Sequence, residues 1–220
     1  MPNLLLFGHP FSSYHQKALI GLYENAVPFT LRMLSPDEPK NGAEWATLWP
    51  LKRFPVLVDG DRTIAEATII LEYLDLHYRG DVPLIPDDPA AALDTRMMDR
   101  FFDNYISTPQ QKIVFDALRP DDAKDPAGVA DAHAQLETAY AWLDGVMAAR
   151  QWATGDVFTL ADCGAAPFLF YAHWVHPIGP QFANVLAYRN RLLARPSFAR
   201  AVDEARPYRG FFPLPVPDED

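Results

Sequence analysis

Two adjacent hydroxyl side chains, Ser12 and Ser13, stand where a helix is expected to begin. Serine is a favourable N-cap in any protein, because its oxygen accepts a hydrogen bond from the first turn. A hydroxyl here can also donate a hydrogen bond to a thiolate, which the positive end of the helix supports as well. Such a bond to a charged group contributes about 1.5–3 kcal/mol, which lowers a thiol pKa of about 8.5 by roughly one to two units. Ser12 is the preferred donor, and Ser13 and the phenol of Tyr14 are the alternatives.

A proline at the entrance of a predicted strand is the second chemical feature. Phe54-Pro55 directly precedes the apolar run Val56–Val58. Because proline has no N–H, it removes one hydrogen bond from the strand ladder. An ordinary trans proline at a strand start is one interpretation. A cis bond is the other, and it would turn the Phe54 backbone toward a ligand with a peptide backbone of its own.

Glu66-Ala67-Thr68 opens a further predicted helix. An acidic residue in a first turn is favourable in any helix. The unpaired N–H groups of that turn also suit a carboxylate, and Glu66 can bind an amino group. Lys52 and Arg53 can hold a second carboxylate or can simply be solvated surface charges. These segments together suit a small peptide with amino, thiol and carboxylate groups.

The elements that must position these residues alternate between strand and helix. Apolar runs and a turn at Asp59-Gly60 predict strands, and spacing of three and four residues predicts helices. The predicted strands are 4–7, 29–33 and the hairpin 56–64, and the predicted helices are 13–25, a short one near 43–48, and 66–77. A strand reached through a helix runs parallel to the first. We expect four strands, three in one sense and one reversed.

Beyond Tyr78 the sequence contains turn residues and then only helix signals. Residues 79–89 are rich in proline, glycine and aspartate, which indicates a linker. The predicted helices are 90–118 with a bend at Pro109, 127–150, 160–174, 181–194 and 197–205. We therefore expect an α/β domain over residues 1–78, an all-helical domain over 90–205, and a proline-rich extended tail over 206–220 that frays at its end.

The composition narrows the function classes. A formal charge of −10 opposes binding to nucleic acid and to anionic membranes. Cys163 is the single cysteine, so no intramolecular disulfide is possible and a reducing, cytoplasmic location is expected. The longest apolar stretch, 163–175, is too short and too interrupted to span a bilayer. His133, His173 and His176 have no matching ligand spacing, so no metal site is predicted.

In four segments the sequence resembles the soluble glutathione S-transferases. Residues 12–18 resemble the serine-type motif of zeta-like classes, with Ser12 at the catalytic hydroxyl. Residues 49–57 resemble the Asn-Pro-x-x-x-Val-Pro-x-Leu segment, whose Val-Pro bond is cis. Residues 64–70 resemble the Glu-Ser-x-x-Ile turn that holds the γ-glutamyl end of glutathione, and residues 158–162 resemble a buried capping box. The segments follow one another at family spacing.

This resemblance implies a thioredoxin-like βαβαββα domain followed by the family's all-helical domain. It also implies glutathione as co-substrate, a homodimer, and a serine, Ser12, that ionises the thiol. Glutathione would contact Ser12, Ser13, Lys52, Arg53, Phe54, Pro55, Glu66, Ala67 and Thr68. The second-substrate pocket would include Tyr14, Tyr105 and Trp174.

Two departures from the family pattern bear on binding. Ala67 replaces the usual serine and removes one side-chain hydrogen bond to the γ-glutamyl carboxylate, for which Thr68 is the possible substitute. Phe54 replaces valine, which leaves backbone pairing intact. The expected activity is conjugation of glutathione to a small apolar electrophile. Glutathione-dependent isomerisation or peroxide reduction is the alternative, as is a non-catalytic scaffold with the same fold.

Overall fold

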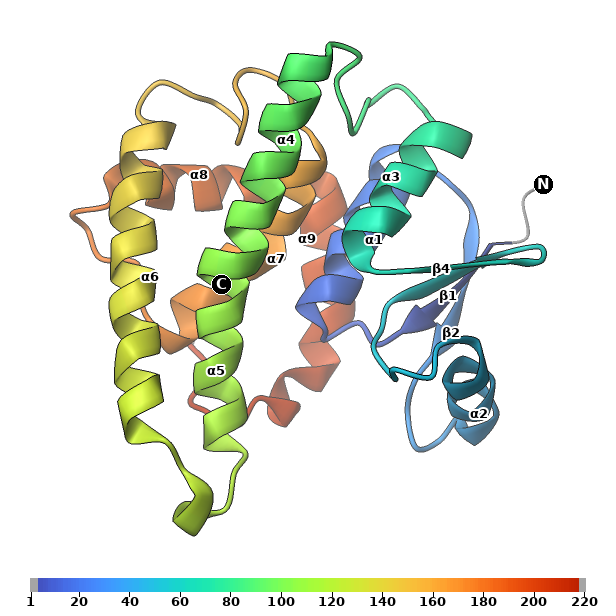
Figure 1. The fold of residues 1–220 in the computed structure, drawn as a ribbon, viewed down its shortest axis with the longest axis horizontal. Helices are drawn as coiled ribbons and strands as arrows, with labels where there is room; N and C mark the ends of the chain where they lie inside the picture. Colours follow the sequence, from blue (N-terminus) through green and yellow to red (C-terminus); the bar gives the residue numbers. More distant parts are fainter. Residues whose placement is uncertain (1–3, 218–220) are drawn as a thin grey trace.

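The computed structural model describes residues 4–217, in an α/β half followed by a helical half (Figure 1). The sheet contains β1 (Leu4–Gly8), β2 (Phe29–Met33), β3 (Val56–Asp59) and β4 (Arg62–Ala65) in the order β2-β1-β3-β4. β1 is parallel to β2 and antiparallel to β3, and β3 is antiparallel to β4. Three strands therefore share one sense and β3 is reversed. The predicted thioredoxin-like order is confirmed.

Three helices complete the α/β half: α1 (Ser13–Glu24), α2 (Pro39–Leu48) and α3 (Ala67–His77). Figure 1 shows α1 and α3 on the side of the sheet that faces the helical half, with α2 at the end of β2. α2 begins four residues before the predicted start. Its first residue is Pro39, and the fixed φ of proline suits the first position of a helix. The polar face of this helix hid it from a search for apolar spacing.

The helical half is a bundle in which α4 stands between α3 and α6 (Figure 1). Its elements are α4 (Pro89–Phe101), η1 (Phe102–Ser107), α5 (Thr108–Ala117), η2 (Asp121–Ala123), α6 (Pro126–Met147), α7 (Leu160–Val175), α8 (Ala183–Leu193), α9 (Pro196–Ala205) and η3 (Arg206–Phe211). α7 runs through the core, and 14 of its residues are buried. Its proline, Pro167, lies inside that buried helix. The expected two-part fold class is confirmed.

The bend predicted at Pro109 is instead an irregular segment before that residue. Regular α-helix ends at Phe101 and returns at Thr108, and η1 between them is a π-helix. The Thr108 backbone N–H bonds to the Asp103 carbonyl, five residues back. Proline lacks an N–H and clashes with the carbonyl four residues before it, so the wider turn accommodates Pro109. The same turn brings Asp103 and Asn104 to the boundary between the two halves.

The start of α7 is held by the capping box that the sequence indicated. Asp162 Oδ2 accepts from the Thr159 N–H at 2.8 Å and from the Thr159 hydroxyl at 3.1 Å. Asp162 Oδ1 accepts from the Tyr188 hydroxyl at 2.6 Å and from the Ala153 N–H at 2.8 Å. Asp162 is completely buried, so these four bonds replace the water that it loses.

The tail differs from the extended strap expected from residue 206. Residues 206–211 form the 3₁₀-helix η3, in which the Tyr208 ring packs on His9 with centroids 4.6 Å apart. The expected fraying lies at residues outside the described range. Within residues 4–217, the structure contains no helix with the length and apolar character needed to cross a membrane.

Candidate functional site

A cleft of about 760 Å³ lies between the α/β half and the helical half. The residues from the sequence analysis that line it are Ser12, Ser13, Tyr14, Lys52, Arg53, Phe54, Pro55, Glu66 and Ala67. They come from three separate segments that the fold brings together: the start of α1, the loop before β3 and the start of α3. Thr68, Tyr105 and Trp174 lie outside this lining.

Ser12 is the N-cap of α1, with extended backbone angles of φ −90° and ψ 126°. Its Oγ accepts a hydrogen bond from the His15 backbone N–H at 3.4 Å. Accepting this bond uses an oxygen lone pair and leaves the hydroxyl proton free to donate. The two interpretations of Ser12, a cap and a donor to a ligand, are therefore compatible in one geometry.

His9 and His15, the two histidines beside this turn, are uncharged near neutral pH. His15 is completely buried, and neither of its ring nitrogens has a hydrogen-bond partner within residues 4–217. Burial, and then the nearby His9, lower the pKa of His15 to about 3. Burial also lowers the pKa of His9. Both rings are thus neutral near pH 7, and the positive potential at Ser12 comes from the α1 dipole.

Tyr14 lies deeper, against the helical half. Its hydroxyl accepts from the Ser107 hydroxyl at 3.3 Å, and its ring packs edge-on against Phe168 with centroids 4.9 Å apart. Burial, and then the Asp103 carboxylate, raise the pKa of Tyr14. The phenol therefore keeps its proton near neutral pH, and it can donate this proton in a hydrogen bond.

The loop before β3 forms the second wall of the cleft. The Phe54-Pro55 bond is cis, as the sequence analysis expected. Trp45 of α2 donates from Nε1 to the Arg53 carbonyl at 3.0 Å, which ties this loop to α2. Lys52 has φ +52°, a left-handed conformation that is unfavourable for residues other than glycine. The hydrogen bond from Trp45 and the unusual φ of Lys52 thus fix the backbone that holds the exposed Lys52 and Arg53 side chains.

Glu66 is the second lining residue with left-handed backbone, at φ +70°. It is the N-cap residue of α3, so the first free N–H groups of that helix follow immediately. Strained residues of this kind persist only where the surrounding structure holds them, and they concentrate at ligand sites. The strained backbone at Glu66 is therefore in the same turn, residues 66–68, that the sequence suggested as a carboxylate site.

The Thr68 hydroxyl lies in a cluster of charged residues at the edge of the cleft. It accepts from Lys17 Nζ at 2.9 Å and from Arg100 Nη2 at 2.6 Å, and it donates to Asp99 Oδ2 at 2.8 Å. A hydroxyl has one proton and two lone pairs, so all of its capacity is used. The Thr68 side chain cannot replace the hydroxyl that Ala67 lacks, unless this cluster rearranges.

Sequence reasoning missed that charged cluster. Lys17 is completely buried and pairs with Asp99 at 2.6 Å and with Asp103 at 3.2 Å. Arg100 contacts the same two carboxylates and lines the cleft. Burial raises the pKa of Asp103, although Lys17 acts in the opposite direction. The signal in the sequence was Lys17 itself, because it stands in the predicted helix 13–25 directly before the apolar run 18–20.

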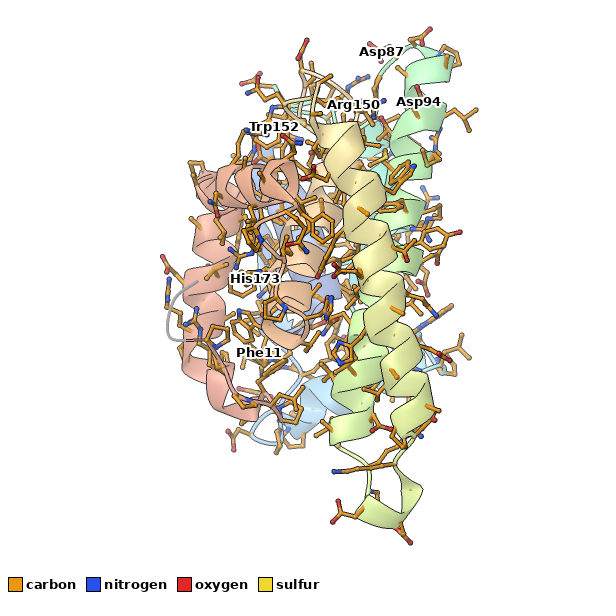
Figure 2. All side chains as sticks on the ribbon, turned by 90° about the vertical axis from the view of Figure 1, so that its left-hand side faces the viewer. Phe11, Asp87, Asp94, Arg150, Trp152 and His173 are labelled. Atoms are coloured by element: carbon orange, nitrogen blue, oxygen red, sulfur yellow. The ribbon has the colours of Figure 1, made fainter. Side chains whose placement is uncertain are left out.

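Most of the remaining apolar lining comes from the helical half and the tail. It consists of Val114, Phe115, Leu118, Tyr171, Phe211, Phe212 and Pro213, and Phe11 and Trp49 of the α/β half add to it. Phe11, labelled in Figure 2, comes from the loop before α1, and its ring lies 5.6 Å from that of Tyr171 of α7. Trp174 is buried behind this wall, 5.1 Å from the Phe212 ring. Tyr105 is 59% exposed and packs beside Phe101.

Cysteine and metal chemistry have no visible site among the described residues. Cys163 is buried, and burial raises the pKa of its thiol well above the usual range. Within residues 4–217, no group of three or more histidine, cysteine, aspartate or glutamate side chains could hold a metal ion.

Comparison with known proteins gives the same picture over both halves. Residues 6–88 match the family model "Glutathione S-transferase, N-terminal domain" and residues 126–203 match "Glutathione S-transferase, C-terminal domain". A stringent starvation protein A homolog of Haemophilus ducreyi is 28% identical over 208 residues, 92% of this chain and 91% of that protein. Glutathione S-transferase GstB of Escherichia coli is 24% identical over 203 residues, 90% and 97% of the two chains.

Solved structures are similar over most of the chain. A glutathione S-transferase from Methylobacterium radiotolerans, crystallised in complex with glutathione sulfonate, superposes with a TM-score of 0.78 at 28% identity. The match covers 91% of this chain and 94% of that one.

Proposed function

This chain belongs to the glutathione S-transferase family, and from that membership we propose that it binds glutathione in the cleft and ionises its thiol. The observation that carries the proposal is Ser12: a hydroxyl with a free proton, at the positive end of α1, in the wall of that cleft. The hydroxyl stabilises the thiolate by donating to it and does not remove the proton, which passes to solvent.

The rest of the tripeptide has partners at family spacing. The turn at Glu66 and Ala67 takes the γ-glutamyl end, the Phe54 backbone pairs with the cysteinyl residue, and Lys52 and Arg53 take the glycine carboxylate. The similar protein from Methylobacterium radiotolerans was crystallised with glutathione sulfonate, which supports binding of a glutathione-like peptide by this chain. Lys52, Arg53 and Arg100 line the cleft together with the acids Glu66 and Asp103, so cations exceed acids there in a chain with a charge of −10, which suits an anionic peptide.

The second substrate is a small apolar electrophile. The thiolate sulfur forms a bond to the electrophilic carbon, and a leaving group departs or a double bond takes up a proton. The aromatic and aliphatic wall, with the rings of Phe115, Phe211 and Phe212, supports this choice. Isomerisation and peroxide reduction use the same thiolate and remain alternatives within the enzyme class.

A non-catalytic scaffold is the second candidate. Its specific support is the identity to stringent starvation protein A homologs, 28% for the protein of Haemophilus ducreyi against 24% for GstB of Escherichia coli. Ala67 in place of the usual serine favours it too, because it removes one donor to the peptide. A scaffold has no need to lower the thiol pKa, so ionisation of bound glutathione separates the two candidates.

Calorimetric titration with glutathione, followed by a panel of small electrophiles, tests the proposal. The wild-type chain is expected to bind glutathione and to conjugate at least one apolar electrophile. Ser12→Ala should keep most of the affinity, because the other segments hold the peptide, and should lose conjugation near neutral pH. If Ser13→Ala or Tyr14→Phe causes that loss and Ser12→Ala does not, the function stands and the assignment of the donor is wrong.

We also propose that the protein is a homodimer. Large apolar side chains are exposed on adjacent helices: Ile69 and Leu76 on α3, and Leu93 and Met97 on α4. Leu93 and Met97 are one helical turn apart, as Ile69 and Leu76 are two turns apart, so each pair shares a face. Exposed apolar side chains on two neighbouring helices support burial against a second copy.

A further inference from the structure

Arg100 lies in the wall of the cleft beside the first turn of α3, although it comes from α4 in the helical half. Its Nη2 atom donates to the hydroxyl of Thr68, the second residue of α3, at 2.6 Å. The guanidinium group is therefore adjacent to the N–H groups of Ala67 and Thr68, which have no acceptor within their own helix. A fixed positive charge thus stands at the turn proposed for the γ-glutamyl end.

The position of Arg100 is set from the buried side. Nη2 also contacts the carboxylates of Asp99, at 2.6 Å, and Asp103. Asp99 is completely buried, and Lys17 pairs with the same two carboxylates from the interior. The two aspartates therefore keep a cation when Arg100 engages a ligand, so binding would leave no buried carboxylate without a partner.

The remaining donors of Arg100 are available. All three contacts use Nη2, and Nε and Nη1 make no hydrogen bond within residues 4–217. The side chain is 51% exposed and lines the cleft. Three N–H donors, one on Nε and two on Nη1, therefore remain, and each can give a carboxylate a charge-assisted hydrogen bond.

Ala67 explains why a further donor is needed at this turn. A serine hydroxyl would donate to the γ-glutamyl carboxylate here, and Ala67 has only a methyl group. Thr68 is fully engaged with Lys17, Arg100 and Asp99. We infer that Arg100 binds the α-carboxylate of the γ-glutamyl residue in place of the missing hydroxyl. This inference rests on the proposed function and assigns a binding role to a residue of the helical half.

The test compares glutathione with 4-aminobutyryl-cysteinyl-glycine, which lacks only that carboxylate. Both are titrated calorimetrically into the full-length wild type, Arg100→Gln and Arg96→Gln. Arg96 is the matched control: it lies one turn earlier on α4, is 45% exposed and pairs with Glu72 of α3, but it does not line the cleft. Arg100→Gln should weaken glutathione by roughly tenfold to a hundredfold and leave the analogue within about twofold. Arg96→Gln should change neither.

Because the readout is a ratio of two ligands on one variant, general damage to the fold lowers both affinities together. An equal loss for both ligands, or no loss, overturns the role of Arg100. If Arg100→Gln does not fold, Arg100→Lys keeps the charge but has a single nitrogen, which cannot contact the buried aspartates and the ligand from separate atoms as the guanidinium does, so it should lose only glutathione, by several-fold. A wild-type chain that binds neither peptide overturns the proposed function and the inference with it. Wild-type binding without preference for glutathione overturns the inference alone.

Discussion

At the scale of single residues, the site depends on groups that satisfy a structural and a chemical demand together. The Ser12 oxygen caps α1 while its proton remains free, and Glu66 begins α3 in a strained conformation. Sequence alone predicted both positions, because caps and first-turn acids have strong local signals. It did not predict Arg100, since the partners of that residue come from α3 and from the π-helical turn.

His15 leads to a prediction about pH and stability. Burial, and then His9, lower the pKa of His15 to about 3 in the folded state, against about 6.5 when unfolded. As pH falls below 6.5, the unfolded chain binds a proton that the folded chain does not, so stability is lost with falling pH. Between pH 7 and pH 5 this single group removes about 2 kcal/mol.

Urea unfolding at the two pH values measures this contribution. His15→Gln removes the titrating ring, so the variant should lose about 2 kcal/mol less than the wild type between pH 7 and pH 5. Equal losses in the two proteins would show that His15 titrates alike in both states. The comparison of each protein with itself cancels any cost of the substitution at pH 7.

At the scale of elements, local sequence signals predicted most helices and strands. The elements that they did not predict depend on contacts between distant parts of the chain. The Asp59-Gly60 hairpin and the Thr159–Asp162 capping box are short motifs whose partners are near in sequence, and both are present. The π-helical segment 102–107 was not predicted, because the signal from Pro109 says that a helix is disturbed but not on which side. η3 was not predicted either, because its Tyr208 packs on His9, which is far away in the sequence.

The capping box makes a prediction about α7. Asp162→Ala leaves the Tyr188 hydroxyl and the N–H groups of Ala153 and Thr159 buried without acceptors. The free energy of unfolding should fall by about 3–5 kcal/mol. In Figure 2, Trp152, next to Ala153, lies near the top of the molecule, and Phe11, in the cleft wall, lies well below it. Binding by the folded fraction should therefore change little.

Denaturant unfolding monitored by circular dichroism checks this value. Asp203→Ala is the control, because its side chain is 70% exposed and pairs with Arg206 on the surface. The control should differ from the wild type by less than about 0.5 kcal/mol. A comparable loss in both variants would mean that the buried network around Asp162 contributes no more than a surface pair.

At the scale of the whole molecule, the cleft exists because the two halves meet. Lys17 and Asp103 are 86 residues apart, and Gln16 and Tyr171 are 155 apart, yet both pairs are hydrogen bonded. No local pattern predicts such contacts. Local patterns could not place the expected pocket residues Tyr105 and Trp174 either, and both lie outside the lining. The family resemblance predicted how the two halves are arranged. The residues that connect the halves could be identified only from the structure.

The proposed dimer is tested by mass in solution. Light scattering should give about twice the chain mass of 24.7 kDa for the wild type at micromolar concentration. Leu93→Glu combined with Met97→Glu places two charges on the apolar face of α4 and should give a monomer. Val157→Glu, at a residue that is 59% exposed in the loop before α7, should remain dimeric. A monomeric wild type would remove the dimer proposal.

Thiolate absorbance of the bound peptide as a function of pH tests most directly whether this protein ionises glutathione. With saturating wild-type protein, the midpoint should lie roughly one to two units below that of free glutathione, on the strength of one charged hydrogen bond. Ser12→Ala should return the midpoint most of the way to the free value while glutathione stays bound. A wild-type midpoint equal to that of free glutathione, with binding confirmed by calorimetry, would contradict the account and favour the scaffold.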